Sequence, residues 1–447
     1  MSLFDGKRLT NKTFKLDIDR MRQGWYSDKY FANINRMLLV LSAEKYLYAG
    51  KYPNLPATSL VDQIPVGDME VEMQWFTRRA GTTIVVGVDK ALEMLKLCTG
   101  YFEGDQFINT SDRLEVMAVQ DGDIVKSDGD PMRVQPVLRV RGRYRDFALL
   151  ETPTLGILTR SSRIATNVYE TFVAAGGKPV LFFPARFDLH EVQAADGYAY
   201  NIALQRFNYD HASDLGPFIS TDAQGDWWGG AGGGTVAHAA IASFLGDTAE
   251  VMMAFSRILP VNIPRIALVD FNNHSVRDSL RVQDAMFSEY RRMLELGDHN
   301  EAEKYKLYGV RLDTSASIRD ESVTPLGDPA LDLGVNPRLV FNVRQALDSA
   351  WESWDLSKKW KSVAKEYCQN VKIVVSGGFA PEKIKRFEKL GVPVDIYAVG
   401  SYLFNNNGAT VSDFTADVVR IKVNGEWVDM AKIGRKHLDN PNLQQVW

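Results

Sequence analysis

From about Glu151 onward, short apolar runs alternate with amphipathic helical stretches, and this alternation constrains the fold more than any other feature of the chain. Helical stretches such as Ser279–Leu296 and Val343–Trp354 separate the runs. Strands that alternate with helices predict a parallel sheet, and strands this apolar suit a sheet covered on both faces. We therefore expect an α/β barrel over residues 151–404. The five runs are 179–186 (PVLFFPAR), 264–271 (PRIALVDF), 307–315 (LYGVRLDTS), 371–378 (VKIVVSGG) and 394–401 (VDIYAVGS).

The first 150 residues have a mixed helix and strand pattern. Between Leu114 and Leu150, short apolar runs alternate with Asp-Gly turns, which predicts antiparallel hairpins. We expect residues 1–150 to form an α+β domain and residues 405–447 to pack back on it. Further elements expected from periodicity are a helix over 33–48, strands over 71–78 and 83–88, and a helix near 90–98.

Composition excludes several classes of protein. Of the 447 residues, 45% are hydrophobic and 24% are charged, which is typical of a globular chain. The net charge of −4 lacks the basic surplus of a general nucleic-acid or anionic-membrane binder, so local groups must hold any anionic ligand. Two cysteines are too few for a disulfide framework or a Cys-based zinc site. Without a secretory or membrane-spanning apolar run, we expect a soluble, cytoplasmic protein.

Glycine and serine residues follow the last two apolar runs. In a barrel the functional groups lie at the carboxyl ends of the strands, often with a phosphate at the last two. Glycine lets backbone N–H groups approach an anion closely, and a following helix N-terminus adds a favourable dipole. We favour a phosphate site over the alternative of tight strand-to-helix turns. Its residues would be Ser376, Gly377, Gly378, Gly400 and Ser401.

Two carboxylates, Asp270 and Asp313, end two other apolar runs. Beside a phosphate they could ligate Mg²⁺, bind ribose hydroxyls or stabilise a cationic transition state. The structural alternative is that each is a helix N-cap. Arg311 lies two residues before Asp313 and therefore on the same face of the strand. One strand thus offers both a cation and an anion to a substrate.

A glycine cluster at 229–234 leads through Thr235 to His238, one of only six histidines. His238 should lie in the first turn of an apolar helix. The helix dipole there disfavours an imidazolium and favours an attached anion. His238 is therefore a candidate nucleophile. The alternative is a mobile loop with a capping threonine and a structural histidine.

Together these segments resemble the nicotinate phosphoribosyltransferase family, over about Tyr26–Ser401. The resemblance implies a type II phosphoribosyltransferase fold, with an irregular α/β barrel and an N-terminal α+β open-faced sandwich. Six segments match in the family's order. They are YSDKYF (26–31), the region ending in Leu-Glu-Thr at 150–152, GTVAHA (234–239), GVRLDTS (309–315), VVSGGF (374–379) and AVGSYL (398–403).

The resemblance implies transfer of the phosphoribosyl group of phosphoribosyl pyrophosphate to nicotinate in NAD salvage. ATP hydrolysis would drive the reaction through a phosphohistidine at His238. Asp270 and Asp313 would face the ribose and the pyrophosphate, whose Mg²⁺ arrives with the substrate. Arg311 would contact the pyrophosphate or the pyridine carboxylate. Arg163 would be a further candidate for the pyrophosphate.

The resemblance also implies an aromatic slot for the base. Phe183 would stack on one face of the ring, with Arg186 nearby. Tyr30 would stack on the other face from a second subunit, because the family's active sites lie at a head-to-tail dimer interface. We therefore expect at least a homodimer.

Two departures from the family pattern leave the base open. Thr221 and Asp222 stand where family members carry a Gly-Thr-Ser-Asn-like element, and they resemble nicotinamide-selective relatives. Pro184 in FPARFD replaces the usual glycine and removes a backbone donor. The alternatives are a nicotinamide phosphoribosyltransferase, a quinolinate phosphoribosyltransferase and a non-catalytic nucleotide-binding barrel. The glycine-His segment argues against the second, and the ionisable groups at the strand ends argue against the third.

Overall fold

The computed structural model describes residues 4–55 and 61–447. The chain divides into two compact units. The first unit comprises residues 1–169, 198–206 and 405–447, and the second comprises 170–197 and 207–404. Among the described residues, no helix combines the length and the apolar character needed to cross a membrane.

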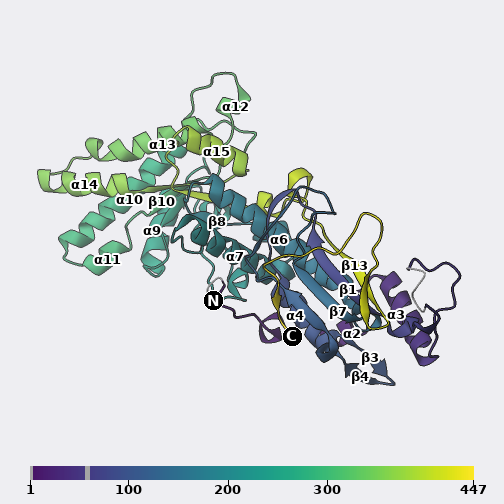
Figure 1. Cartoon of the computed structure of the whole chain (residues 1–447). Coiled ribbons are helices and arrows are strands. Elements are labelled where there is room, and N and C mark those ends of the chain that lie inside the picture. Colours follow the sequence, from purple (N-terminus) through teal and green to yellow (C-terminus); the bar gives the residue numbers. More distant parts are fainter. Residues whose placement is uncertain (1–3, 56–60) are drawn as a thin grey trace. The chain divides into compact units, whose positions relative to one another are not determined.

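Five parallel strands form the sheet of the second unit (Figure 1). Each strand lies within one of the five apolar runs, so the predicted parallel sheet is confirmed. Its edge at β8 is extended by an isolated parallel bridge between Phe182 and Ile219. In spatial order the strands are β8 (Val180–Phe182), β12 (Ile396–Val399), β11 (Lys372–Val375), β10 (Gly309–Leu312) and β9 (Ile266–Leu268).

Side chains from both edge strands of this sheet belong to one buried apolar cluster. Leu181 of β8 and Ile266 of β9 belong to one buried cluster with Val374, Ile396 and Ala398. Among the described residues, no strand pairing joins β9 to β8 and closes the ring. The fold is therefore the irregular α/β barrel that the resemblance implied.

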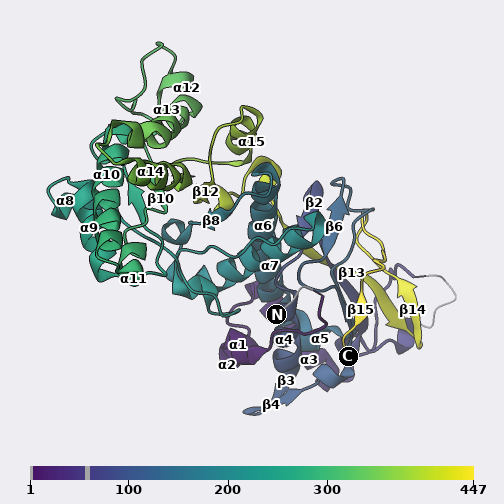
Figure 2. The same ribbon diagram turned by 90° about the vertical axis from the view of Figure 1, so that its left-hand side faces the viewer.

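Helices connect the strands of the barrel. Helix α10 packs against α9 and α13, and α13 packs against α14 (Figure 2). Helix α13 begins earlier than periodicity indicated, because Asn336 caps it by accepting from the Leu339 N–H and Pro337 occupies its first position. The helices are α7 (Gln193–His211), α8 (His238–Ser243), α9 (Thr248–Ile258), α10 (Ser275–Glu295), α11 (His299–Glu303), α12 (Pro329–Asp332), α13 (Pro337–Ser349), α14 (Lys358–Asn370) and α15 (Pro381–Lys389).

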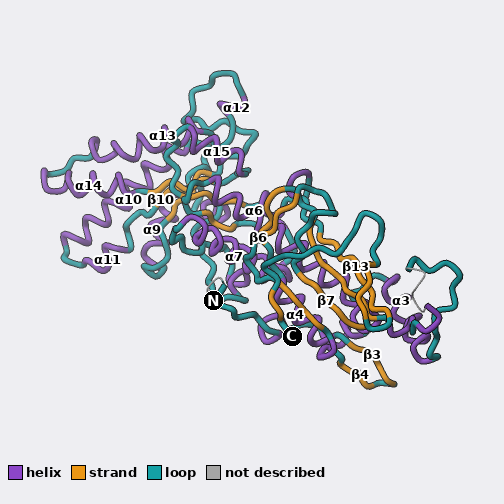
Figure 3. Tube along the Cα trace, in the orientation of Figure 1, coloured by secondary structure: helices purple, strands orange, loops and turns teal. Residues whose placement is uncertain are grey.

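A six-stranded antiparallel sheet forms the centre of the first unit, with its strands in orange in Figure 3. The spatial order is β14–β13–β1–β7–β5–β15. One face packs on apolar side chains of α4 and of the first turns of α6. Trp75 of β1 is fully buried there, and its indole N–H donates to Thr154 Oγ1 at 3.1 Å. The strands are β1 (Glu70–Thr77), β5 (Glu115–Ala118), β7 (Leu138–Arg143), β13 (Phe414–Val423), β14 (Glu426–Asp429) and β15 (Gln444–Gln445), and the helices include α1 (Asn11–Phe14), α2 (Ile18–Arg22), α3 (Lys29–Ala43), α4 (Val88–Cys98), α5 (Tyr144–Phe147) and α6 (Glu151–Ala174).

The hairpin prediction for residues 114–150 is wrong in its pairing. Strand β5 pairs with β7, whereas β6 (Ile124–Ser127) pairs with β2 (Gly81–Ile84). The Asp-Gly turn between β5 and β6 has another role. Asp121 Oδ1 accepts the N–H groups of Gly87 and Val88, each at 2.8 Å, at the start of α4. The Asp-Gly turn therefore contacts the start of α4 and does not join β5 and β6 into a hairpin. Strands β3 (Gly100–Glu103) and β4 (Gln106–Asn109) form a separate ribbon.

Candidate functional site

The carboxyl ends of β9, β10 and β11 bring three of the predicted residues together. The register between these strands places Asp270, Asp313 and Ser376 in one row. Ser376 Oγ donates to Asp313 Oδ1 at 2.7 Å. Burial raises the pKa of Asp270, and the charge of Asp313 raises it further, whereas His238 lowers it. Two carboxylates that influence each other thus share one edge of the barrel.

His238 is the first residue of α8, and its ring faces Asp270. The ring nitrogen Nε2 lies 3.0 Å from Asp270 Oδ1 and 3.1 Å from Oδ2. Because a carboxylate accepts this bond, Nε2 carries the proton, and in the neutral form of the ring the lone pair lies on Nδ1. The His238 side chain is 45% exposed and that of Asp270 only 8%. The imidazole is therefore accessible to solvent, while the carboxyl group that it contacts is buried. The cap of α8 is Ala237, so Thr235 is not the capping threonine of the structural alternative.

Arg311 projects from β10 toward Phe183, which follows β8. Its Cζ lies 5.6 Å from the Phe183 ring centroid. Burial lowers the pKa of Arg311, while Asp313 and Asp270 raise it. Nη2 donates to the Val236 carbonyl at 3.4 Å, but among the described residues its buried Nε has no acceptor. A cation with an unused donor therefore lies beside an aromatic ring.

The segment after β8 carries the second predicted cation. Arg186 lies on the one-turn helix η5 (Ala185–Phe187), exposed, with Cζ 5.1 Å from the Phe187 ring. The Pro184 carbonyl accepts the Phe187 N–H at 2.8 Å, so the proline begins this turn. A Cβ at Gly400 would lie 2.7 Å from the Phe187 ring. The glycine therefore permits the loop after β12 to lie against this turn.

The loop after β11 has the backbone of an anion cradle. Gly377 and Gly378 have φ values of 86° and 69°, which L side chains rarely adopt. In the part of the chain that the structure describes, the N–H groups of residues 377–380 have no hydrogen-bond acceptor, and neither do those of Gly400 and Ser401. Successive free N–H groups in such turns make concavities that bind anions. Ser376 differs, because it is 3% exposed and its N–H donates to the Leu312 carbonyl.

The glycine cluster packs on the short helix η7 (Asp222–Gly225). Asp222 Oδ1 accepts the Gly232 N–H at 2.8 Å. Thr221 caps η7 and its hydroxyl donates to Gln193 Oε1 at 2.8 Å. A Cβ at Gly225 would lie 1.9 Å from the Gly230 carbonyl oxygen. Asp222 therefore stabilises, through this hydrogen bond to Gly232, the glycine segment that leads to His238.

Comparison with known proteins identifies chains of similar sequence and fold. Residues 58–162 match the family model described as quinolinate phosphoribosyl transferase, N-terminal domain. Nicotinate phosphoribosyltransferase 2 of Arabidopsis thaliana is 26% identical over 314 residues, which cover 65% of this chain and 50% of the relative. The chain thus spans about half the length of this curated relative.

Two solved structures have the same fold. Nicotinate-nucleotide pyrophosphorylase from Pyrococcus furiosus superposes with a TM-score of 0.60 at 23% identity, over 94% of this chain and 80% of that one. Human nicotinic acid phosphoribosyltransferase superposes with a TM-score of 0.55 at 17% identity, over 88% of this chain and 74% of that one. The chain is therefore similar in sequence to nicotinate phosphoribosyltransferases and shares the fold of these two solved structures.

Two residues that the family resemblance assigned to the site lie in the first unit. Tyr30, in the first turn of α3, is 57% exposed and its hydroxyl donates to Asp28 Oδ2 at 3.1 Å. Arg163 lies in α6. Their roles toward the base and the pyrophosphate remain predictions.

Lys383 was not among the residues predicted from the sequence. It lies in the first turn of α15, and its Nζ is 3.4 Å from the Gly377 carbonyl oxygen. The sequence signal is weak, because a lysine in an amphipathic helix normally indicates a solvated face. The structure instead places it against the glycine loop.

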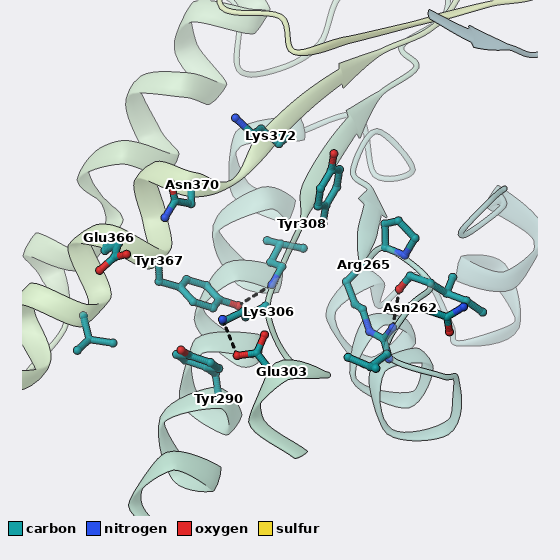
Figure 4. Close-up of a pocket in the computed structure, with 15 residues that line it drawn as sticks. Asn262, Arg265, Tyr290, Glu303, Lys306, Tyr308, Glu366, Tyr367, Asn370 and Lys372 are labelled. Carbon is teal, nitrogen blue, oxygen red and sulfur yellow. Dashed lines mark hydrogen bonds and ion pairs between the residues drawn. The ribbon is translucent and has the colours of Figure 1, made fainter. Parts of the chain in front are cut away.

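A cavity of about 480 Å³ lies at the amino ends of β9, β10 and β11, opposite the edge that carries the site residues (Figure 4). Lys306 and Glu303 form an ion pair in its wall, near the ring of Tyr290. The Arg265 guanidinium donates to backbone carbonyls there. None of the predicted site residues lines this cavity.

Proposed function

We propose that the chain is a nicotinate phosphoribosyltransferase of NAD salvage. The observation that carries the proposal is the convergence of His238, Asp270, Asp313 and Arg311 on the edge of the barrel that also carries the two glycine loops. The names of the relatives support the same activity. The reaction breaks the bond from ribose C1′ to pyrophosphate and forms a bond from C1′ to the pyridine nitrogen.

The carboxylates suit the transition state of this reaction. As pyrophosphate departs, positive charge develops on the ribose ring, and fixed carboxylates nearby stabilise it. The hydroxyl of Ser376 holds Asp313 in place. Asp270 is held by the His238 ring. Both anions are therefore oriented before the substrate binds.

Magnesium would enter with phosphoribosyl pyrophosphate. Among the described residues, no group of three or more His, Cys, Asp or Glu side chains could hold a metal ion. The donor set nevertheless fits, because Mg²⁺ is commonly bound by one or two carboxylates together with substrate phosphates. Asp270 and Asp313 would be those carboxylates. When bound, the ion would neutralise charge on the leaving pyrophosphate.

Phe183 and Arg311 are the groups that we expect to bind a flat anionic base. The aromatic ring offers a stacking face, and the free Nε–H of Arg311 offers a donor for a carboxylate. Asp222, which would favour an amide, has one oxygen engaged by the Gly232 N–H. These contacts favour nicotinate over nicotinamide.

His238 would couple ATP to the reaction. Its Nδ1 lone pair would attack the γ-phosphorus of ATP, and ADP would leave. The phosphorylated ring would keep its hydrogen bond from Nε2 to Asp270. Hydrolysis of that phosphohistidine would then drive the equilibrium toward the mononucleotide. An exposed Tyr30 fits a contribution to the base slot from a second copy in a homodimer.

Product analysis tests the proposal. The purified chain would be incubated with phosphoribosyl pyrophosphate, Mg²⁺ and nicotinate, nicotinamide or quinolinate, with and without ATP. We expect nicotinate mononucleotide and pyrophosphate, with ADP formed and the yield raised when ATP is present. Failure to consume phosphoribosyl pyrophosphate with any base would refute it.

The match of residues 58–162 to the quinolinate transferase model favours that activity as the second candidate. Release of CO₂ from quinolinate, without any effect of ATP, would select it.

A further inference from the structure

Lys383 occupies an unfavourable position for a lysine. It lies in the first turn of α15, where the helix dipole repels a cation. Its neighbours are the Gly377 carbonyl, at 3.4 Å, and the ring of Phe379, with Nζ 4.1 Å from the centroid. Across residues 4–55 and 61–447, no carboxylate forms an ion pair with it. Burial lowers the pKa of Lys383 to about 8.

The next lysine on the same helix shows the ordinary arrangement. Lys385 is exposed, and its Nζ lies 2.8 Å from Glu382 Oε1. A surface pair of this kind contributes little and has no bearing on the loop. Lys383, in contrast, is turned toward the loop and held by a carbonyl and an aromatic face. A half-buried ammonium group with no anion costs free energy that a bound anion would recover.

The loop that Lys383 contacts also carries the free backbone donors. The N–H groups of residues 377–380 have no acceptor within the described chain. They can hold phosphate oxygens, but they are neutral groups, whereas a phosphate monoester carries between one and two negative charges at pH 7. A cation at the rim of the same loop supplies the charge that the backbone lacks. Since the net charge of the chain is −4, this cation must be local.

We propose that Lys383 is the charged ligand of the 5′-phosphate of the phosphoribosyl group, which the loop at residues 376–380 would hold. This assignment deepens the proposed transferase activity and rests on it for the identity of the ligand. The bound phosphate would lie over the N–H groups of the loop and would form an ion pair with Nζ. Lys383 would therefore act on binding of phosphoribosyl pyrophosphate, and not on the bond that breaks at C1′.

Replacement of Lys383 by methionine tests the assignment, with Lys385→Met as the matched control on the same helix. Binding of ribose 5-phosphate and of inorganic phosphate to the full chain would be measured by titration calorimetry. We expect Kd to rise about 10- to 100-fold in Lys383→Met, as for loss of a charge-assisted hydrogen bond, and to change less than about two-fold in Lys385→Met. In turnover, KM for phosphoribosyl pyrophosphate should rise by the same factor while kcat stays within about three-fold. Unchanged phosphate binding in Lys383→Met would overturn the assignment.

The calorimetry needs no catalysis, so it separates this inference from the proposed activity. A wild-type chain that binds ribose 5-phosphate through Lys383 but transfers it to no pyridine base would keep the phosphate site and refute the transferase. If Lys383→Met does not fold, amine labelling of the wild-type chain provides a second measurement. Phosphate should slow the labelling of Lys383 at least about five-fold and leave Lys385 unaffected, as expected for an occupied ion pair. Equal labelling with and without phosphate would count against the site.

Discussion

Ser376 Oγ donates a hydrogen bond of 2.7 Å to Asp313 Oδ1, so the serine of the Ser-Gly-Gly loop orients a carboxylate of the proposed active site. Ser376 is 3% exposed, whereas the two glycines that follow are exposed. The loop therefore has two functions in adjacent residues. Its serine faces the carboxylate, and its glycines offer their N–H groups outward.

Replacing Ser376 by alanine should reduce turnover more than binding. Asp313 would lose its orienting donor, and we expect kcat to fall about 10-fold while KM for phosphoribosyl pyrophosphate changes less than about three-fold. Steady-state kinetics would measure both. Ser357→Ala is the control, because that exposed serine precedes α14 without a side-chain capping bond. A rise in KM alone would instead indicate that the Ser376 hydroxyl binds phosphate directly.

Replacing His238 by asparagine should abolish the coupling to ATP. The variant lacks the nitrogen that would accept the phosphoryl group, so we expect no incorporation of ³²P from γ-labelled ATP and no stimulation of turnover by ATP. His299→Asn is a matched control, because His299 is also the first residue of a short helix and is exposed. Stimulation by ATP that survives in His238→Asn would exclude this residue from the mechanism.

Arg311 should discriminate between the two pyridine bases. Replacing it by methionine keeps the apolar stem beside Phe183 but removes the donor for a carboxylate. We expect KM for nicotinate to rise about 10- to 100-fold and KM for nicotinamide to change far less. Parallel kinetics with the two bases would show the difference. An equal loss for both bases would assign Arg311 to the pyrophosphate.

Asp121 should make the stability of the first unit depend on pH. Burial raises the pKa of Asp121 to about 7, with a further increase from Asp89, opposed by Arg8 and by hydrogen bonds from Val88 and Tyr198. The folded state thus holds a proton that the unfolded state releases near pH 4, and stability should fall as pH rises from about 4 to about 7. A shift of about three units corresponds to at most about 4 kcal/mol.

Asp121→Asn removes this titration and keeps the side-chain oxygen that accepts from Gly87 and Val88. Urea unfolding at pH 5 and pH 8 should therefore show a smaller loss of stability in the variant than in the wild type. The difference between the two proteins isolates Asp121 from other groups that titrate. An identical pH dependence would show that the Asp121 carboxyl is ionised in the folded protein.

Local pattern was sufficient to predict the parallel strands. An apolar run such as 371–378 suits a strand covered by helices on both faces, and no distant information is needed to recognise it. The row formed by Asp270, Asp313 and Ser376 also follows from pattern, since all three residues lie near the carboxyl ends of such runs. What the pattern could not supply is which polar atom faces which. Ser376 was predicted to belong to a phosphate site, and in the folded chain its hydroxyl donates to Asp313 Oδ1.

The errors and omissions come from contacts between distant segments. Asp121-Gly122 has the sequence of a tight hairpin turn, but the Asp121 Oδ1 accepts the N–H groups at the start of α4, and β6 joins β2. Lys383 was missed for a similar reason. Only the folded loop after β11 places its Nζ next to the Gly377 carbonyl.

The pairing of β1 with β13 has a consequence for biosynthesis. The register joins Met73 to Val418, and the residues of the second unit lie between them in the chain. Until the ribosome has released β13, the nascent polypeptide exposes one side of β1 with unpaired N–H and C=O groups, which invite association with other chains. The amino-terminal segment therefore emerges early but can complete its sheet only after the barrel has been translated.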